Sequence, residues 1–347
     1  MSQPNAQEMA APRRFQFEWT PLMVILIANV LLILFLQLVA GQSLFEPRTL
    51  ATLTPLLGVM VIIGLAQAFV IGTGGIDLSL PSVVTAMGII MLRESGGQDE
   101  MLPKAFLVAA MVCLIVGIVN GLLVEVMGLN ALVTTLATGQ LVLGATIIYR
   151  EGALQTKVPP LLSSWAQSNI FSVSFILVVA VAFAALILVF VRRITTGRRL
   201  VLASASKRAS ELLGIRYLAL RVSAWIVASL IGGVGGILLA GQIASPDMSS
   251  GGPYLLSSII VVVLGGAVLT GGRVGPFATA LGATFIILLD HGLAVMGIST
   301  GARTLVQGLV LALGLAGVGL LMRPRTEKTS RGSKVPAEPD EAALQQA

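Results

Sequence analysis

Apolar residues run along this chain in long, unbroken blocks separated by short polar stretches. Each block is about 20 residues long, the length that a helix needs to cross about 30 Å of hydrocarbon. The blocks are solid rather than alternating, which favours helices over the strands of a membrane barrel. Ten blocks are predicted, at 21–40, 51–71, 76–92, 106–127, 130–149, 171–191, 222–241, 254–271, 276–296 and 304–322. The pattern predicts an all-α polytopic membrane protein with about ten transmembrane helices.

The composition also indicates a membrane-embedded protein. Only 11% of the residues are charged, against about 25% in soluble domains. The net charge of +6 could suit a nucleic-acid-binding protein, but the basic residues lie in loops between apolar blocks. We therefore expect the lipid bilayer as a partner and no nucleic acid.

The placement of the basic residues predicts the orientation. With the N-terminus inside, cytoplasmic segments hold sixteen of the 22 lysines and arginines, and the external segments hold six. This is the positive-inside bias, and it predicts an N-in, C-in topology. The predicted organisation is a cytoplasmic N-terminal segment (1–20), a membrane domain (21–322) and a charged, disordered cytoplasmic tail (323–347). The membrane domain contains one long cytoplasmic loop, at about 192–221.

The stretch from Gly72 to Pro81 is the most informative part of the chain. Gly74 and Gly75 free the backbone to bend, and Pro81 suits the first turn of a helix. Asp77 and Ser79 then fall near the N-terminus of that helix. The pair could simply cap the helix, because its free N–H groups favour a carboxylate. It could equally line a solute or water path, because an ionisable group at membrane depth is costly.

A weak internal echo accompanies this stretch. Thr73-Gly74-Gly75 and Thr270-Gly271-Gly272 are each followed within a few residues by proline. Duplicated halves with broken helices at matching positions are common in transporters.

The long cytoplasmic loop contains a short amphipathic pattern. Ser206 is a plausible N-cap, Leu212 and Leu213 follow Ala209 on one face, and Gly214 can end the helix. A helix of this kind suits docking into a groove on another protein. The alternative is a basic loop that serves only topology.

Nucleotide chemistry is missing from the chain. None of the five lysines follows a glycine, so no P-loop can form. Energy from ATP would have to come from separate subunits. One cysteine (Cys113) and one histidine (His291) supply neither a metal cluster nor a catalytic set. We expect no cofactor and no enzymatic activity.

One alternative function rests on three ionisable residues. Asp290 and His291 are adjacent within an apolar block, and with Asp77 they could form a relay in a proton-coupled secondary carrier. The competing interpretation is that Asp290 and His291 lie in a hydrogen-bonded interior or near the external interface.

Several motifs resemble one known family. The run Gly74-Gly75-Ile76-Asp77-Leu78-Ser79 resembles the GGIDLS signature of ribose-type (carbohydrate) ABC importer permeases, the inner-membrane components of binding-protein-dependent systems. The further matches, in the family's order, are Asn120-Gly121, the run from Leu129 to Leu136, Gly272-Arg273, Gly282 and His291-Gly292-Leu293. The chain departs from the family pattern at Leu80-Pro81, where Val-Gly is usual, and at His291, where Asn is usual. The resemblance covers about residues 21–322.

The resemblance implies a permease subunit that moves a sugar or sugar-like solute across the bacterial inner membrane. Its implied partners are ABC ATP-binding subunits, a periplasmic solute-binding protein and a second permease, which is either a copy of this chain or a paralogue. The residues implied for the translocation path or its structural signature are Gly74, Gly75, Asp77, Ser79, Asn120, Thr134 and Thr135. Those implied for coupling to the ATPase are Ser206, Ala209, Glu211, Leu212 and Gly214. Neither the residues nor the resemblance identifies the solute.

Overall fold

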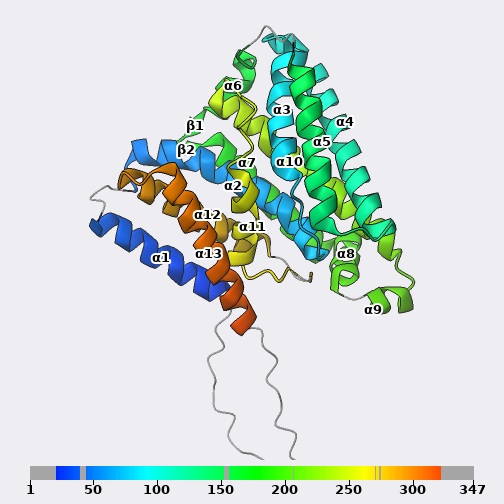
Figure 1. Cartoon of the computed structure of the whole chain (residues 1–347). Coiled ribbons are helices and arrows are strands. Elements are labelled where there is room, and N and C mark those ends of the chain that lie inside the picture. Colours follow the sequence, from blue (N-terminus) through cyan, green and yellow to red (C-terminus); the bar gives the residue numbers. More distant parts are fainter. Residues whose placement is uncertain are drawn as a thin grey trace, which may run out of the picture.

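The fold is a bundle of helices, described here from a computed structural model (Figure 1). The structure describes residues 21–39, 44–151, 156–205, 207–269, 271–272 and 275–321. Each predicted apolar block overlaps one described helix, with ends that differ by several residues: α1 (Pro21–Val39), α2 (Pro47–Gly72), α3 (Leu80–Ser95), α4 (Leu102–Gly121), α5 (Ala131–Arg150), α7 (Phe175–Arg193), α10 (Tyr217–Ile243), α11 (Tyr254–Leu264), α12 (Pro276–Val295) and α13 (Thr300–Leu321).

Seven segments in the described part of the chain are helical, long and apolar enough to cross a membrane. They contain α2, α4, α5, α7, α10, α12 and α13. Two further apolar helical stretches, Leu22–Leu38 of α1 and Tyr254–Leu264 (α11), are shorter. The chain is thus an all-α polytopic membrane protein, while the count of ten crossings stays a prediction. The predicted block 254–271 is helical only to Leu264, because Gly266 takes a left-handed conformation (φ 83°) that ends α11.

The α2 and α10 helices form the centre of the bundle. The α10 helix packs on α2, α3 and α4, while α2 also contacts α7, α11 and α12. The close approach of these helices depends on glycines, which have no side chain. A Cβ at Gly236 of α10 would lie 2.9 Å from Val84 Cα of α3. A Cβ at Gly117 of α4 would lie 2.6 Å from Ile226 Cα of α10. Small residues therefore set the helix spacing, as is common in membranes.

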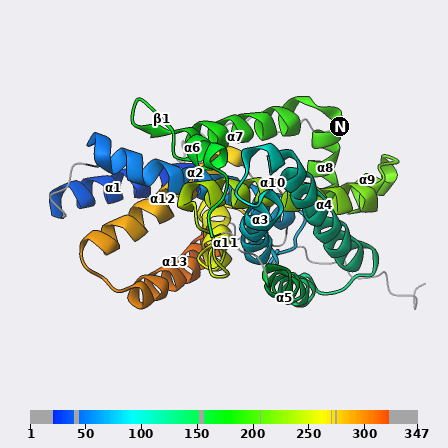
Figure 2. The ribbon, with the colours of Figure 1, turned by 90° about the horizontal axis from the view of Figure 1, so that it is seen from above.

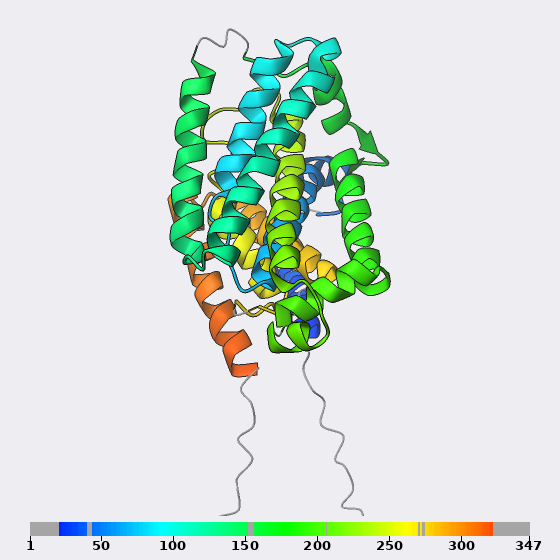
Figure 3. The ribbon, with the colours of Figure 1, turned by 90° about the vertical axis from the view of Figure 1, so that its right-hand side faces the viewer.

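Short helices, a 3₁₀ turn and a small hairpin lie at the two ends of the bundle. A 3₁₀ turn, η1 (Asp99–Met101), the helix α6 (Pro160–Ala166) and a hairpin of β1 (Asn169–Ile170) and β2 (Val173–Ser174) are at one end. The helices α8 (Thr195–Ala205) and α9 (Lys207–Leu212) are at the opposite end (Figures 1 and 3). A π-helical turn, η2 (Leu122–Val126), continues α4.

The outer helices present large apolar side chains to the surroundings. Leu38, Leu186, Leu141 and Leu305 are 83%, 63%, 74% and 77% exposed on α1, α7, α5 and α13, as expected for surfaces that face lipid or another membrane subunit. Seen from above, α7 lies along one edge of the molecule, and α5 and α13 lie along the opposite edge (Figure 2). The cysteine is the small core residue that its apolar context predicts, since Cys113 is buried with its sulfur 3.5 Å from Met87 Sδ.

Candidate functional site

The signature loop, residues 73–79, joins α2 to α3. Its first turn closes because Gly74 adopts φ 84°, a conformation that suits glycine. The N–H groups of Gly74 and Gly75 donate back to the carbonyls of Ile71 and Val70, at 2.9 and 3.2 Å. These two bonds form a Schellman motif that satisfies the last carbonyls of α2.

A chain of side-chain hydrogen bonds crosses from the loop to α4. Asp77 Oδ1 accepts from the N–H of Ser79 at 2.8 Å and from its hydroxyl at 2.5 Å. Asn120 Nδ2 in turn donates to the Ser79 hydroxyl at 2.9 Å. The hydroxyl of Ser79 is thereby donor and acceptor at once, and it fixes the start of α3 against α4.

Two further polar side chains hold the loop backbone. Thr135 of α5 accepts the N–H of Leu78 at 3.0 Å and donates to the carbonyl of Ile76 at 3.1 Å. Gln67 of α2, in the amide orientation that satisfies both groups, bonds the N–H and the carbonyl of Asp77, each at 3.2 Å. Four backbone groups of this buried loop are thus paired with side chains of neighbouring helices.

Burial decides what the signature loop does in this conformation. Asp77, Ser79, Asn120 and Thr135 are 3%, 0%, 1% and 0% exposed. Asp77 accordingly closes a turn onto Ser79, the N-cap residue of α3, and its side chain is enclosed in this conformation. Thr134 is buried beside Thr135, and its carbonyl accepts the hydroxyl of Thr138 at 3.0 Å. The seven predicted path residues therefore gather around one junction, with Thr134 at its margin.

The second glycine pair lies against the first. The N–H of Gly272 donates to the carbonyl of Gly72 at 2.9 Å. A Cβ on Gly271 would lie 3.0 Å from the Gly74 nitrogen. Thr270, the remaining member of the echo, lies outside the described residues. The two glycine-rich breaks thus meet at the end of the bundle where α2 stops.

The predicted amphipathic helix of the long loop is present as α9. Gly214 takes φ 64°, and its N–H and that of Ile215 donate to the carbonyls of Glu211 and Ser210, at 3.1 and 2.9 Å. This second Schellman motif ends the helix where the sequence predicts. Leu212 and Leu213 are 81% and 66% exposed, so their apolar side chains protrude from the described chain. Ser206, the predicted N-cap, lies outside the described residues.

A cavity of about 680 Å³ lies among α2, α10, α11, α12 and α13, with a mainly apolar wall that includes a few charged and polar side chains. Asp290 lines it and forms an ion pair with Arg303 at 2.9 Å, and Gln307 Nε2 lies 3.4 Å from Asp290 Oδ1. His291 Nε2 is buried and has no hydrogen-bond partner among the described residues. Asp290 is thus held by Arg303 and Gln307, as the interpretation of a hydrogen-bonded interior expects. The Asp–His relay of the carrier hypothesis does not form among the described residues.

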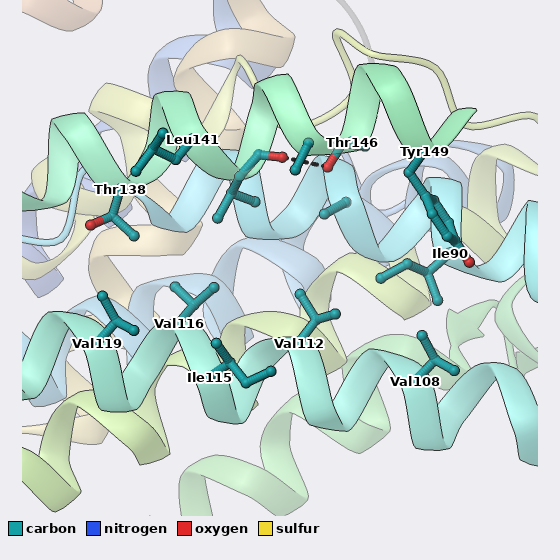
Figure 4. A pocket seen from close by; sticks show the side chains of 13 residues that line it. Ile90, Val108, Val112, Ile115, Val116, Val119, Thr138, Leu141, Thr146 and Tyr149 are labelled. Carbon is teal, nitrogen blue, oxygen red and sulfur yellow. Dashed lines mark hydrogen bonds between the residues drawn. The ribbon is translucent and has the colours of Figure 1, made fainter. Parts of the chain in front are cut away.

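A second hollow, of about 410 Å³, runs between α4 and α5 (Figure 4). Valine, isoleucine and leucine side chains from α3, α4 and α5 dominate its wall. The hydroxyls of Thr138 and Thr146 are used on their own helix, at 3.0 and 2.7 Å. A wall with so few available polar groups fits an acyl chain or an apolar helix better than a polyhydroxylated solute.

Sequence reasoning missed three residues around the signature loop. From the sequence, Gln67 is one of several polar residues in apolar blocks that could line a path or bond neighbouring helices, and Glu125, near the inner end of its block, is expected at the membrane interface. The side chain of Glu125 is 5% exposed, and it is bonded to Arg221 and Trp225, two partners that the sequence does not indicate. Trp225 packs on Gly75, where a Cβ would lie 2.8 Å from its ring. An acidic residue inside an apolar block is the signal that could have identified this contact.

The fold and site define a membrane-spanning transport subunit that lacks a nucleotide-binding motif of its own. The chain belongs to the "Branched-chain amino acid transport system / permease component" family, whose model matches residues 49–315. It is therefore a permease subunit of an ABC importer, not an enzyme and not a proton-coupled carrier.

Relatives with specific names are similar at 26–28% identity. The ribose import permease protein RbsC of Bacillus subtilis is 27% identical over 79% of this chain and 86% of that protein. The fructose import permease protein FrcC of Rhizobium meliloti is 26% identical over 86% and 85%. A probable ABC transporter permease, y4mJ of Sinorhizobium fredii, is 28% identical over 79% and 80%. No solved structure matches the chain.

Proposed function

We propose that this chain carries a sugar or sugar-like solute across the bacterial inner membrane. Relatives at similar identity are named as ribose, fructose and autoinducer 2 import permeases. Separate ATP-binding subunits drive the transport, and a periplasmic binding protein delivers the solute.

The exposed tip of α9 carries the proposal. Leu212 and Leu213 protrude beside a glycine-capped end, on the loop that holds eight of the basic residues. Exposed leucines on a short cytoplasmic helix suit a groove on a second protein. We assign the ATP-binding subunit as that protein, with Ser206, Ala209, Glu211, Leu212 and Gly214 as the coupling residues.

The proposed topology has ten crossings with both termini in the cytoplasm. The α8–α9 end of the bundle then faces the cytoplasm, and the α6 end faces the periplasm (Figure 1). The basic residues of the long loop support this orientation. Residues 1–20 and 323–347 are, in this proposal, cytoplasmic extensions of a single membrane domain at 21–322.

The proposed site of the second permease is the edge that α5 and α13 share (Figure 2). Gln140 in the middle of α5 and Thr304 on α13 are both exposed. An amide facing lipid at that depth would lack partners, so we place the solute path and the second permease against this edge. The seven signature residues position the helices that border it.

Reconstitution in liposomes tests the function. The chain, its ATP-binding subunit and its binding protein are combined, and uptake of labelled ribose and fructose is measured with and without ATP. We expect accumulation only with ATP and only with the ATP-binding subunit. Accumulation by the permease alone would refute the proposal.

A further inference from the structure

Glu125 occupies an unusual position at the inner end of α4. It lies in the π-helical turn η2, whose wide bond joins the Met127 N–H to the Leu122 carbonyl at 3.0 Å. Its carboxylate is 5% exposed, although it bears a charge beside apolar helices. Turns of this kind are frequent at functional sites, and a buried carboxylate is retained only where strong donors surround it.

The donors come from one face of α10. Arg221 Nε bonds Glu125 Oε2, and Arg221 Nη2 bonds Oε1 at 3.1 Å, which makes a two-bond fork. Trp225 Nε1 donates to the same Oε1 at 2.9 Å. Arg221 and Trp225 are four residues apart, so they project from one side of the helix. We call Glu125, Arg221 and Trp225 the inner clamp.

The inner clamp lies close to the coupling helix in the sequence. The α10 helix begins at Tyr217, three residues after Gly214, and the Tyr217 N–H closes a turn onto the Ile215 carbonyl at 2.8 Å. The Arg221 guanidinium lies 5.2 Å from the centre of the Tyr217 ring. The connection is short and internally bonded, so movement of α9 must reach the first turns of α10.

On its other side, the inner clamp contacts the signature loop. The Trp225 ring is fully buried and packs on Gly75, where any side chain would collide with it. Four residues further along the loop, Ser79 is held by Asn120 of α4, the helix that continues into the Glu125 turn. The signature loop is thus in contact at two points, at Ser79 with Asn120 of α4 and at Gly75 with Trp225 of the inner clamp.

We propose that Glu125, Arg221 and Trp225 are positioning residues that transmit the movement of α9 to the signature loop and so couple ATP hydrolysis to transport. This inference rests on the proposed function. The indole of Trp225 is rigid, with its N–H bound to Glu125 and its ring against Gly75. A displacement of α10 therefore moves the signature loop rather than deforming the side chain. The inner clamp therefore keeps α4, α10 and the loop moving together.

The Trp225→Phe variant is the sharpest test, because it removes both contacts of the indole, the Nε1 bond to Glu125 and the Cζ2–Cη2 edge that packs on Gly75, while it keeps an apolar aromatic side chain in α10. The full complex in liposomes is supplied with ATP and with labelled ribose or fructose, whichever the unmodified complex accumulates. The readout is solute moved per ATP hydrolysed. We expect hydrolysis to continue and this ratio to fall about fivefold or more.

Tyr149→Phe is the matched control. Tyr149 donates its hydroxyl to Glu94 at the opposite end of the bundle, so the variant also loses one aromatic–carboxylate bond. We expect its ratio to equal that of the unmodified complex. A Trp225→Phe ratio that is unchanged, or that falls equally in Tyr149→Phe, would overturn the inference.

The double variant Glu125→Leu/Arg221→Leu provides a second test in case the Trp225→Phe complex does not assemble. Replacing both partners of a buried ion pair with apolar residues often preserves folding. We expect an assembled complex that hydrolyses ATP with a low transport ratio. If neither variant assembles, or the double variant transports normally, the clamp is only structural. If the unmodified complex shows no ATP-dependent uptake, the proposed function itself fails.

Discussion

The backbone N–H of Gly272 donates to the carbonyl oxygen of Gly72 at 2.9 Å, and this bond joins two glycine-rich breaks from opposite halves of the sequence. Both breaks precede a helix that has proline in its first turn, α3 with Pro81 and α12 with Pro276. At this contact a Cβ on Gly271 would crowd the backbone of Gly72 and Gly74, whereas one on Gly272 would meet open space.

Gly271→Ala should destabilise this contact. Gly271 has φ 96°, and the added Cβ would lie 3.0 Å from the Gly74 nitrogen. A residue forced into such a conformation costs about 1–3 kcal/mol. Thermal unfolding in detergent should show a lower midpoint. Gly144→Ala is the control, because it lies within α5 with nothing within 4 Å of the new Cβ, and it should not lower the midpoint.

Ser79→Ala should loosen the start of α3. The substitution removes an acceptor for Asn120 and a donor to Asp77, and a buried polar group left unpaired costs about 1–3 kcal/mol. The same unfolding measurement should detect the loss.

Asp77→Asn tests whether Asp77 acts as a cap or lines the path. An amide oxygen can still accept from Ser79, so we expect ATP-driven uptake to stay within about a factor of ten of the unmodified protein, since one net hydrogen bond is worth about 1 kcal/mol. Complete loss of uptake in a variant whose unfolding midpoint is unchanged would indicate that Asp77 lines the solute path.

Leu212→Ser/Leu213→Ser should weaken binding of the ATP-binding subunit. Both leucines protrude at the tip of α9, and burying each at an interface contributes about 1.5–3 kcal/mol. The amount of ATP-binding subunit that copurifies with the permease should fall. Phe171→Ser, a 98% exposed side chain at the other end of the bundle, should leave that amount unchanged.

Gly214→Ala should uncouple transport by altering the end of α9. Its φ of 64° disfavours any other residue, so the Schellman turn must shift. We expect ATP hydrolysis to continue while uptake falls. Normal uptake in this variant would reject the coupling assignment of Gly214.

His291→Asn should leave uptake intact. Asp290 pairs with Arg303 and Gln307, so no proton route depends on the imidazole in this arrangement. A protonophore added with ATP maintained should likewise leave uptake unchanged. Inhibition by either treatment would contradict this assignment.

Apolar pattern was enough to predict the helices, because each crossing must satisfy its backbone alone. Local rules also predicted the end of α9, since a glycine after two leucines suffices for a Schellman cap. They did not predict α6 or the β1–β2 hairpin, which are polar segments whose shape depends on tertiary contacts.

The candidate site was predictable only in part. Asp77 and Ser79 are neighbours in the sequence, and capping preference brings them together. The family resemblance implies Asn120 and Thr135 as site residues, but only packing shows that they and Gln67, on three other helices, bond to this loop. The bond partners of Glu125 are hidden from sequence reasoning for the same reason, because Arg221 lies 96 residues away.

The single thiol of the chain has a practical consequence. Cys113 is enclosed between α4 and its neighbours, so a water-soluble maleimide or spin reagent has little access to it. Cysteines introduced in pairs at α9 and beside α6 would then carry the probes alone. Distances across the bundle could be followed through the nucleotide cycle without first removing a native reactive group.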